Sequence, residues 1–289
     1  MPNPLNLFRW LADTEQRERR RQQARHDLRI FQDLCARVEP FLGPLQGQRV
    51  LDVGCGRTYP LTLLFHSLGA RVTGIDIAPI PRDARAFWEI FREGGARAAA
   101  SSLATRLLWD RPYYRELARA APFPLRPRGV DLRRMDAAAL AFPDGTFDLA
   151  VSNAALEHMP DVPAVLRELR RVLRPGGILH VEIHLFPSLS GGHNIPWSVP
   201  GTEVVDLGGV PPWDHLRENR FPAPVFLNRL REHEYRDMVE REFRVLLWEA
   251  EFWEPEHLLT PALEAELTAK GYTREELLKR SVVVVAQPR

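Results

Sequence analysis

The sequence predicts an α/β fold, a mostly parallel β-sheet with helices on both faces. Short apolar runs alternate with longer stretches in which apolar residues recur every three to four positions, and these two patterns are typical of buried strands and amphipathic helices. The first strand, a glycine turn, a helix and the second strand fit within residues 49–76. Such a unit favours a right-handed crossover between parallel strands, and its repetition indicates a sheet covered by helices.

Each element is predicted from its own pattern. Strands are expected over residues 49–54, 71–76, 130–135, 147–152 and 178–185, followed by two apolar runs over 243–253 and 281–286. Helices are expected over residues 13–39, 60–68, 161–173, 226–240 and 261–270. The helix at 161–173 has the clearest signals, because Asp161 is a favoured N-cap and Pro163 suits the first turn. The last two apolar runs are expected to pair antiparallel at one edge of the sheet.

Two segments are too long for single crossovers. Residues 82–129 carry apolar positions for two or three short helices, and residues 187–242 are rich in loop-forming residues. We therefore expect an N-terminal helical extension over residues 1–46 and one domain over 47–289 that carries both insertions. The arginine-rich segment 17–25 of the extension is interpreted as a solvated helix face, with a contact to phosphate or an acidic substrate as the alternative.

The composition excludes several classes of protein. The chain has 289 residues, of which 45% are hydrophobic and 27% charged, a globular balance that argues against global disorder. Its net charge of +1 gives no field that attracts nucleic acid or anionic lipid. Its two cysteines fit a reducing compartment, and the uncharged stretch 183–202 contains too many prolines and glycines for a membrane span. We expect a soluble cytoplasmic protein, and whether it is a homodimer is left open.

A glycine turn followed by an acidic residue predicts a nucleoside-containing ligand. Residues 50–56 read V-L-D-V-G-C-G, and Asp76 follows Gly56 by twenty residues, at the end of the next expected strand. Glycines let a ligand approach the backbone closely, and a carboxylate there can accept hydrogen bonds from both ribose hydroxyls. The dinucleotide fingerprint needs a third glycine at position 59, which is Tyr59, and this disfavours NAD.

Asp52 lies in the apolar end of the first strand, where a buried carboxylate is costly unless it is paired. S-adenosylmethionine carries a sulfonium and an amino group that would compensate this charge, whereas NAD carries no ammonium. The alternative is that Asp52 accepts a hydrogen bond from a backbone N–H.

Five motifs resemble those of the class I S-adenosylmethionine-dependent methyltransferases. They are residues 50–56, 74–76 (G-I-D), 135–148, 152–159 (S-N-A-A-L-E-H-M) and 173–177 (L-R-P-G-G). The last two match the type-11 methyltransferase subgroup, and together the five cover about residues 47–186. The sequence departs from the family at Thr58, where many members have a third glycine. The resemblance implies a Rossmann-like, seven-stranded, mostly parallel sheet in the order 3-2-1-4-5-7-6 with strand 7 antiparallel.

The resemblance also assigns cofactor-binding roles at the matching positions of the first two motifs. Asp52, Gly54 and Gly56 would frame the methionine end of S-adenosylmethionine. Asp76 would hold the ribose, and Ile77 would pack on the adenine.

The later motifs supply the other cofactor contacts that the resemblance implies. Asp136 would accept a hydrogen bond from the adenine amino group, with the Ala137 N–H nearby. Ser152 or Asn153, at the end of the fourth strand, would line the sulfonium.

The implied activity is S-adenosylmethionine-dependent methyl transfer to a small-molecule acceptor at oxygen or nitrogen, with no nucleic acid and no membrane as partner. The two insertions would form the cap over the acceptor. Tyr113, Tyr114, Trp197 and Trp213 would supply aromatic walls, or they would form the core of the insertions themselves. The alternatives are a non-catalytic nucleoside-binding scaffold of the same fold and an NAD-dependent oxidoreductase.

Three histidines are candidates for the general base that an oxygen acceptor needs. His193 leads, because it follows two glycines in a loop near the site; His184 and His158 are the others. The alternatives are that His184 is a hydrogen-bonded core residue and that His158 only fixes a loop. A metal set of His184, His193 and His215 is also conceivable, but spacings of nine and twenty-two residues lack ligand regularity. No metal site is therefore predicted.

Overall fold

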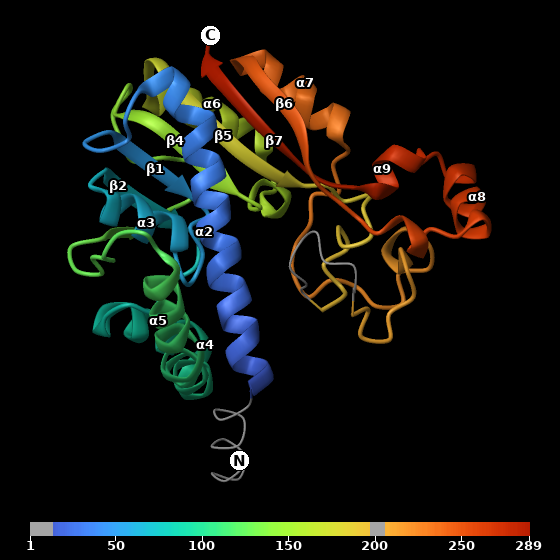
Figure 1. Ribbon diagram of the computed structural model, residues 1–289, viewed down its shortest axis with the longest axis horizontal. Coiled ribbons are helices and arrows are strands. Elements are labelled where there is room, and N and C mark those ends of the chain that lie inside the picture. The colour runs from blue at the N-terminus through green and yellow to red at the C-terminus, as the bar shows by residue number, and fades with distance from the viewer. Residues whose placement is uncertain (1–13, 197–205) are drawn as a thin grey trace. The chain divides into compact units, whose positions relative to one another are not determined.

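The computed structural model describes residues 14–196 and 206–289, which form two compact units. Unit 1 contains the described residues up to Asp136, and unit 2 begins at Ala137 (Figure 1). The seven strands follow the order β3-β2-β1-β4-β5-β7-β6, and β7 runs antiparallel to β5 and β6. The predicted Rossmann-like strand order with its antiparallel seventh strand is confirmed.

Over its described residues, unit 1 contains three parallel strands, four α-helices and one π-helical turn. Its elements are α2 (Thr14–Leu42), β1 (Arg49–Val53), α3 (Pro60–Leu68), β2 (Arg71–Asp76), α4 (Ala84–Thr105), the π-helical turn η1 (Arg106–Asp110), α5 (Arg111–Ala120) and β3 (Asp131–Arg134). Strand β1 pairs in parallel with β2, and β2 with β3. Four of the five β1 residues are buried, as expected of a central strand that is covered on both faces.

The insertion between β2 and β3 packs against the N-terminal helix. Helix α5 packs against the N-terminal half of α2 (Figure 1). The Tyr113 hydroxyl of α5 donates to the Asp27 carboxylate of α2 at 2.5 Å. Burial raises the pKa of Asp27 to about 6. This buried contact makes α2 part of the core of unit 1.

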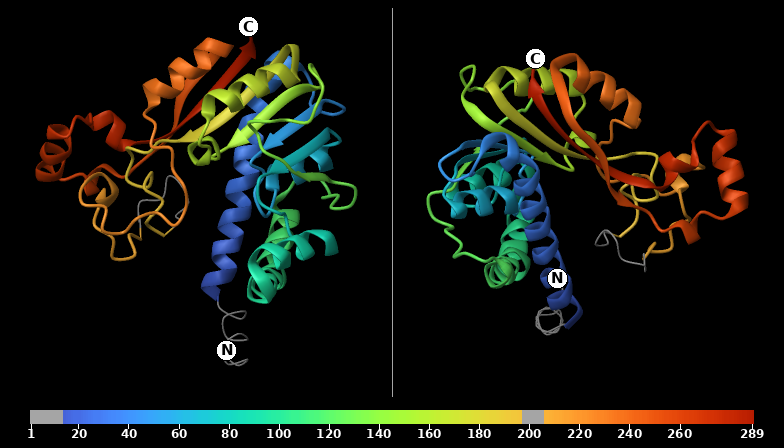
Figure 2. Two further views of the ribbon diagram at one scale, coloured as in Figure 1. Left: turned by 180° about the vertical axis from the view of Figure 1, so that it is seen from behind. Right: turned by 45° about the horizontal axis from the view of Figure 1, so that its top comes forward.

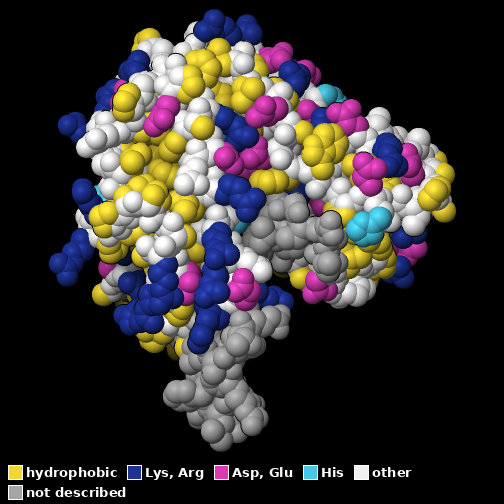
Figure 3. All heavy atoms as spheres, in the orientation of Figure 1, with side chains coloured by type: hydrophobic (Ala, Val, Ile, Leu, Met, Phe, Trp, Pro, Cys, Tyr) yellow, Lys and Arg dark blue, Asp and Glu magenta, His cyan; other side chains and the backbone are white. Residues whose placement is uncertain are grey.

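The arginines at the start of α2 divide between two environments. Arg17, Arg19 and Arg25 are exposed, and Figure 3 shows basic side chains over this half of the helix. Arg20 is instead buried, and its guanidinium lies 5.5 Å from the centre of the Trp109 ring. The expected solvated face is confirmed for the three exposed arginines, while Arg20 serves packing through a cation–π contact.

Unit 2 contains the other four strands. Its elements are β4 (Phe147–Asn153), the 3-10 turn η2 (Leu156–His158), α6 (Val162–Val172), β5 (Leu173–His184), η3 (Asp214–Leu216), α7 (Glu232–Glu242), β6 (Phe243–Trp253), η4 (Glu256–Leu258), α8 (Pro261–Ala269), α9 (Arg274–Leu278) and β7 (Lys279–Pro288). Helix α6 begins as predicted, because the Asp161 side chain accepts from the Ala164 N–H. The expected antiparallel edge pair is β6 with β7.

A separate small core lies beyond the ends of β5, β6 and β7. It joins the loop after β5 to helices α8 and α9, which lie side by side with it in Figure 2. Its buried members are Leu189, Trp213, Leu216, Leu259, Leu267, Leu277 and Leu278. Trp213 is therefore a core residue of the insertion, which was one of the two interpretations of this side chain.

The helix predicted over residues 226–240 begins later than expected. Helix α7 starts at Glu232, because the preceding segment is held in an irregular conformation by contacts with η2. The Asn228 N–H donates to the Glu157 carbonyl at 2.9 Å, and the Asn228 side-chain amide donates to the Leu156 carbonyl at 2.8 Å. These bonds satisfy backbone carbonyl groups of η2 and prevent residues 226–231 from continuing the helix.

The described part of the uncharged stretch 183–202 is the end of β5 followed by turns. Residues 197–202 lie outside the described residues. No helix in the part of the chain that the structure describes has both the length and the hydropathy needed to cross a bilayer.

The Asp27–Tyr113 contact predicts a pH-dependent stability. Because the pKa of Asp27 is about 6 in the folded protein and about 3.9 in an unfolded chain, folding binds a proton between these values. The wild type should lose up to about 3 kcal/mol of unfolding free energy relative to Asp27→Asn as the pH rises from about 4 to above 6.

Urea denaturation of both proteins across this pH range measures the difference. Asp33→Asn, which removes a half-buried carboxyl of the same helix, is the matched control. A wild-type and an Asp27→Asn protein whose stabilities change in parallel with pH would contradict the assignment.

Candidate active site

The glycine turn after β1 is closed against the end of β2. Gly54 and Gly56 both have φ of 70°, a left-handed conformation that other residues adopt only with strain. The Gly54 and Cys55 N–H groups donate to the Ile75 carbonyl at 2.9 and 3.0 Å. The Gly56 N–H donates to the Asp76 carboxylate at 3.0 Å. The carboxylate predicted to hold a ribose is thus aimed at the glycine turn.

The surroundings of Asp76 leave room for a ligand. Its second carboxylate oxygen accepts from the Ala78 N–H at 2.9 Å, so both oxygens are fixed by backbone groups. A Cβ built on Gly56 would meet no atom within 4 Å, which means that the turn borders open space. Ile77, expected against adenine, is 67% exposed. An apolar side chain of this size exposed beside a fixed carboxylate fits a stacking surface for a base.

Asp52 is buried at the end of β1 with 2% of its surface exposed. Its carboxylate accepts from the Thr62 hydroxyl of α3 at 2.5 Å, and burial raises the pKa of this carboxyl to about 6. Both the hydroxyl and the backbone N–H of Thr62 act on this carboxylate. The backbone contact agrees with the alternative interpretation of Asp52, and the hydroxyl was not predicted. Thr62 lies inside a predicted helix, where the sequence gives no sign of a contact with the strand.

The predicted cofactor residues at the end of β4 include polar atoms that lack partners. The Ser152 hydroxyl and the Asn153 side-chain oxygen are buried without a hydrogen bond among the residues that the structure describes. Buried polar groups are normally hydrogen-bonded, so such atoms are ready to bind a ligand. Asp136 is exposed at the end of unit 1, and Ala137 is buried at the start of unit 2.

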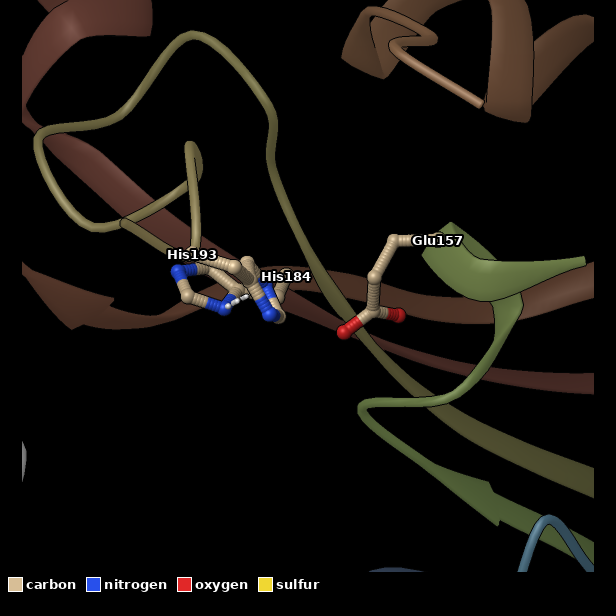
Figure 4. A group of neighbouring side chains, drawn as sticks. All are labelled: Glu157, His184 and His193. Atoms are coloured by element: carbon tan, nitrogen blue, oxygen red, sulfur yellow. Dashed lines mark hydrogen bonds between the residues drawn. The ribbon is translucent and has the colours of Figure 1, made fainter. Parts of the chain in front are cut away.

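Two of the three candidate histidines form a hydrogen-bonded pair in unit 2, with the third against them. His184 ends β5, and its Nδ1 lies 3.1 Å from Nε2 of His193 in the following loop (Figure 4). The His158 ring packs edge-on against that of His193, with ring centres 4.8 Å apart. The structure thus brings together residues that are 35 positions apart, which no spacing rule indicated.

Glu157 completes this cluster and was not singled out in the sequence. Only 3% of its surface is exposed, and neither carboxylate oxygen has a hydrogen-bond partner in residues 14–196 and 206–289. Burial raises the pKa of Glu157 to about 8, and the nearby backbone N–H groups of Glu157 and His184 offset only part of this rise. In Figure 4 the carboxylate extends toward the two imidazoles. The motif S-N-A-A-L-E-H-M contains Glu157, but only its histidine was predicted to act in the site.

A second buried carboxylate orients His184 through a serine. The Ser190 hydroxyl donates to Glu254, and it therefore accepts from Nε2–H of His184 at 2.9 Å. This assigns the proton of His184 to Nε2 and leaves a lone pair on Nδ1, facing His193. Burial and the neighbouring His193 lower the pKa of His184, and burial lowers that of His193 to about 4. Both rings are neutral at pH 7.

His158 has a different environment. Its Nδ1 lies 2.9 Å from the Phe226 carbonyl, which can only accept, so Nδ1 carries the proton and Nε2 carries the lone pair. An imidazole whose Nε2 carries the lone pair can accept a proton at that nitrogen in general base catalysis.

The double glycine in the loop places His193. A Cβ on Gly191 would lie 2.2 Å from the Leu185 carbonyl oxygen, and one on Gly192 would lie 2.5 Å from the His215 ring. Only residues without a side chain allow the loop to fold back this closely on the end of β5. His193 itself has φ of 47°, an unusual backbone conformation for a residue with a side chain.

Other candidates lie outside the cluster. His215 bonds to the Phe186 carbonyl at 2.9 Å and does not join the three-residue group of Glu157, His184 and His193. Tyr113 is a core residue bonded to Asp27, so it is not an aromatic wall, whereas Trp197 lies outside the described residues.

The strand order is that of a Rossmann-like fold, and a fixed carboxylate lies beside its glycine turn. The chain matches the model of a family described as "Methyltransferase domain" over residues 23–246. The chain therefore belongs to the methyltransferase-domain family, as its motifs suggested.

The chain is also similar to individual methyltransferases and to solved structures. An uncharacterized methyltransferase of Mycobacterium tuberculosis is 31% identical over 66% of this chain and 77% of its own length. The 27-O-demethylrifamycin SV methyltransferase of Amycolatopsis mediterranei is 30% identical over 50% of this chain and 42% of that protein. A solved S-adenosylmethionine-dependent methyltransferase of Mesorhizobium loti gives a TM-score of 0.47 at 18% identity, covering 88% of this chain and 96% of that one.

The close approach at Gly191 predicts the cost of a side chain there. Gly191→Ala should lower the free energy of unfolding by about 1–3 kcal/mol, because the new methyl group would displace backbone atoms. Chemical denaturation measures this change. Ser188→Ala, which removes a buried hydroxyl without a partner among the described residues, should leave stability unchanged or slightly higher. Equal stabilities of Gly191→Ala and wild type would show that the loop is not confined as described.

Proposed function

We propose that this protein transfers a methyl group from S-adenosylmethionine to a small-molecule acceptor, at oxygen or nitrogen. The observation that carries the proposal is the Asp76 carboxylate, held over the glycine turn by the Gly56 and Ala78 N–H groups. Each carboxylate oxygen keeps a second lone pair, which suits the two adjacent hydroxyls of a ribose. Family membership supplies the methyl-transfer chemistry that this nucleoside site would serve.

The remaining cofactor residues fit S-adenosylmethionine by their chemistry. Ile77 offers an apolar surface to adenine, and Asp136 an acceptor to its amino group. The partnerless oxygen atoms of Ser152 and Asn153 suit the electropositive region around a sulfonium. Asp52 and the Gly54 turn would frame the methionine end. When bound, the cofactor supplies an activated methyl group, so the protein chiefly aligns the acceptor and excludes water.

A cavity of unit 2 suits a small, largely apolar acceptor. Its volume is about 360 Å³, and its lining includes Phe186, Phe226 and the cationic Arg229. This size lies within the range of small-molecule sites. The names of two partial relatives, which act on demethylrifamycin SV and on 2-methyl-6-phytyl-1,4-hydroquinone, support a small-molecule acceptor. An apolar body with one anionic or polar group is the acceptor that this lining favours.

For an oxygen acceptor we propose His158 as the general base. Its Nδ1–H donates to the carbonyl of Phe226, a residue that lines the cavity. Its Nε2 can therefore take the proton of the acceptor. Burial lowers the pKa of His193, the leading candidate from the sequence, to about 4, which makes it a poor base near pH 7. His184 is bonded to both Ser190 and His193, and it is assigned no proton transfer.

Cofactor binding tests the role of Asp76. In calorimetric titration the wild type should bind S-adenosylmethionine, and Asp76→Asn should bind it about 10–100-fold more weakly, because about 1.4–2.8 kcal/mol of charge-assisted hydrogen bonding is lost. Asp83→Asn, at the exposed start of α4, is the control and should bind as wild type. The proposal is contradicted if the wild type binds NADH instead of S-adenosylmethionine, or if it does not bind S-adenosylmethionine.

Turnover tests the role of His158. Isotope-labelled S-adenosylmethionine is incubated with a metabolite extract, and labelled products are read by mass spectrometry. His158→Gln should transfer label about 100-fold or more slowly, since that is the lower range of general base catalysis, while its cofactor affinity stays unchanged. His66→Gln in unit 1 is the control. Cofactor binding without transfer to any metabolite would favour the scaffold alternative.

A further inference from the structure

Three metal-ligating side chains converge in unit 2 from separate elements. One carboxylate oxygen of Glu157 and one ring nitrogen each of His184 and His193 all lie within 4.8 Å of one another. Glu157 comes from η2, His184 from the end of β5 and His193 from the loop beyond it (Figure 4). The set differs from the three histidines weighed in the sequence, because Glu157 takes the place of His215.

The Glu157 carboxylate is the independent sign that a ligand belongs here. Only 3% of the surface of this residue is exposed, and its two oxygens have no hydrogen-bond partner among the described residues. A buried polar group without a partner costs free energy, and a buried carboxylate costs most. A bound cation would remove this cost.

The charge of the surrounding groups points the same way. Glu157, Glu182 and Glu254 are buried, as is one cation, Arg280, so three carboxylates against one guanidinium leave a net charge of −2 when all are ionised. Electrostatic interactions link these groups, since Glu182 acts on Glu157, and both Glu182 and Glu254 act on Arg280. A divalent cation would balance this charge inside unit 2.

Ser190 and Glu254 hold His184 in the form that can bind a metal ion. Glu254 accepts from Ser190, which accepts from Nε2–H of His184, so the Nδ1 lone pair of His184 faces the cluster. Metal-bound histidines in proteins commonly donate their other ring N–H to a carboxylate or hydroxyl in this manner. His193 needs only its other tautomer to present Nε2, which lies 3.1 Å from that lone pair.

The spacing of the nitrogens also fits one shared ion. Two nitrogens bound tetrahedrally to zinc at about 2.0–2.1 Å lie roughly 3.3 Å apart, close to the 3.1 Å between His184 Nδ1 and His193 Nε2. The Glu157 oxygen lies within 4.8 Å of the two ring nitrogens and would move closer to them to bind the same ion. Two imidazoles and one carboxylate are a ligand set that zinc uses with an open fourth position.

We propose that Glu157, His184 and His193 bind a divalent transition-metal ion of the zinc class. Glu254 and Ser190 are positioning residues for this site, and the fourth coordination position is open to an exogenous oxygen. The proposal is independent of methyl transfer, because metal binding is measured without methyl donor or acceptor.

The test measures zinc binding to tag-free, full-length protein by elemental analysis after dialysis and by calorimetric titration with Zn²⁺. We expect one zinc ion per chain. Glu157→Gln and His193→Ala should each weaken zinc affinity about 100-fold or more, because each removes a direct ligand. Ser190→Ala should weaken zinc affinity about 10–100-fold, the range for residues that orient a metal ligand through a hydrogen bond. His215→Gln, which changes a half-buried histidine outside the set, should bind zinc as wild type.

Thermal unfolding with and without zinc shows that each variant is folded, and zinc should raise the Tm of the wild type more than that of Glu157→Gln. Substitution with Co²⁺ adds a spectroscopic test, because a tetrahedral site gives an intense visible absorption that a surface-bound, octahedral ion lacks. The proposal is overturned if the wild type binds no zinc, if Glu157→Gln and His193→Ala bind it equally well, or if only His215→Gln loses it. Titration of the same variants with S-adenosylmethionine separates failure of the metal site from failure of the cofactor site.

Discussion

The hydrogen bond from the Gly56 N–H to the Asp76 carboxylate is the interaction on which the proposed cofactor site depends. It ties the turn after β1 to the end of β2, and it requires the left-handed backbone that glycine adopts without strain. Because a second amide, that of Ala78, fixes the other oxygen, the carboxylate is oriented before any ligand arrives. Such preorganisation lowers the entropic cost of binding.

A different constraint governs unit 2, where several ionisable groups are buried together. Glu157 and the paired rings of His184 and His193 lie in a low-dielectric environment that favours their neutral forms. Burial accordingly raises the pKa of Glu157 to about 8 and lowers that of His193 to about 4. These three side chains are therefore neutral in the absence of a cation, and a proton on Glu157 and a divalent ion are alternative ways to compensate its buried carboxylate.

The strands and the glycine turn were predictable because they rest on local patterns, whereas the order of the strands was implied only by the resemblance to a known family. The run at residues 49–76 has strand and helix periodicities with glycine stops, and Pro60 and Gly69 do begin and end α3. Strand β7, with its five successive apolar residues at 282–286, was equally evident. The helix expected from residue 226 was misplaced, because contacts of Asn228 with η2 determine its start and leave no local signal.

The candidate site was only partly predictable, for a related reason. The histidines could be named, but their pairing depends on a loop that folds back at Gly191, and the orientation of His184 depends on Glu254, which lies 70 positions away. Residue type also could not show whether an aromatic side chain lines the acceptor pocket or fills the core of an insertion. Tyr113 and Trp213 are both buried in such cores. Periodicity reports which face of an element is apolar, and it carries no information on which polar groups from distant segments meet.

The small core around Trp213 has a consequence for how segments of this protein can be exchanged with those of relatives. It packs the loop after β5, which carries Ser190 and His193, against the helices between β6 and β7, and Glu254 lies at the start of that connection. The two segments are distant in sequence but share one set of apolar contacts and a hydrogen bond from Ser190 to Glu254. A chimera that exchanges only one of them would leave mismatched surfaces, so the two segments would have to be transplanted or varied as a matched pair.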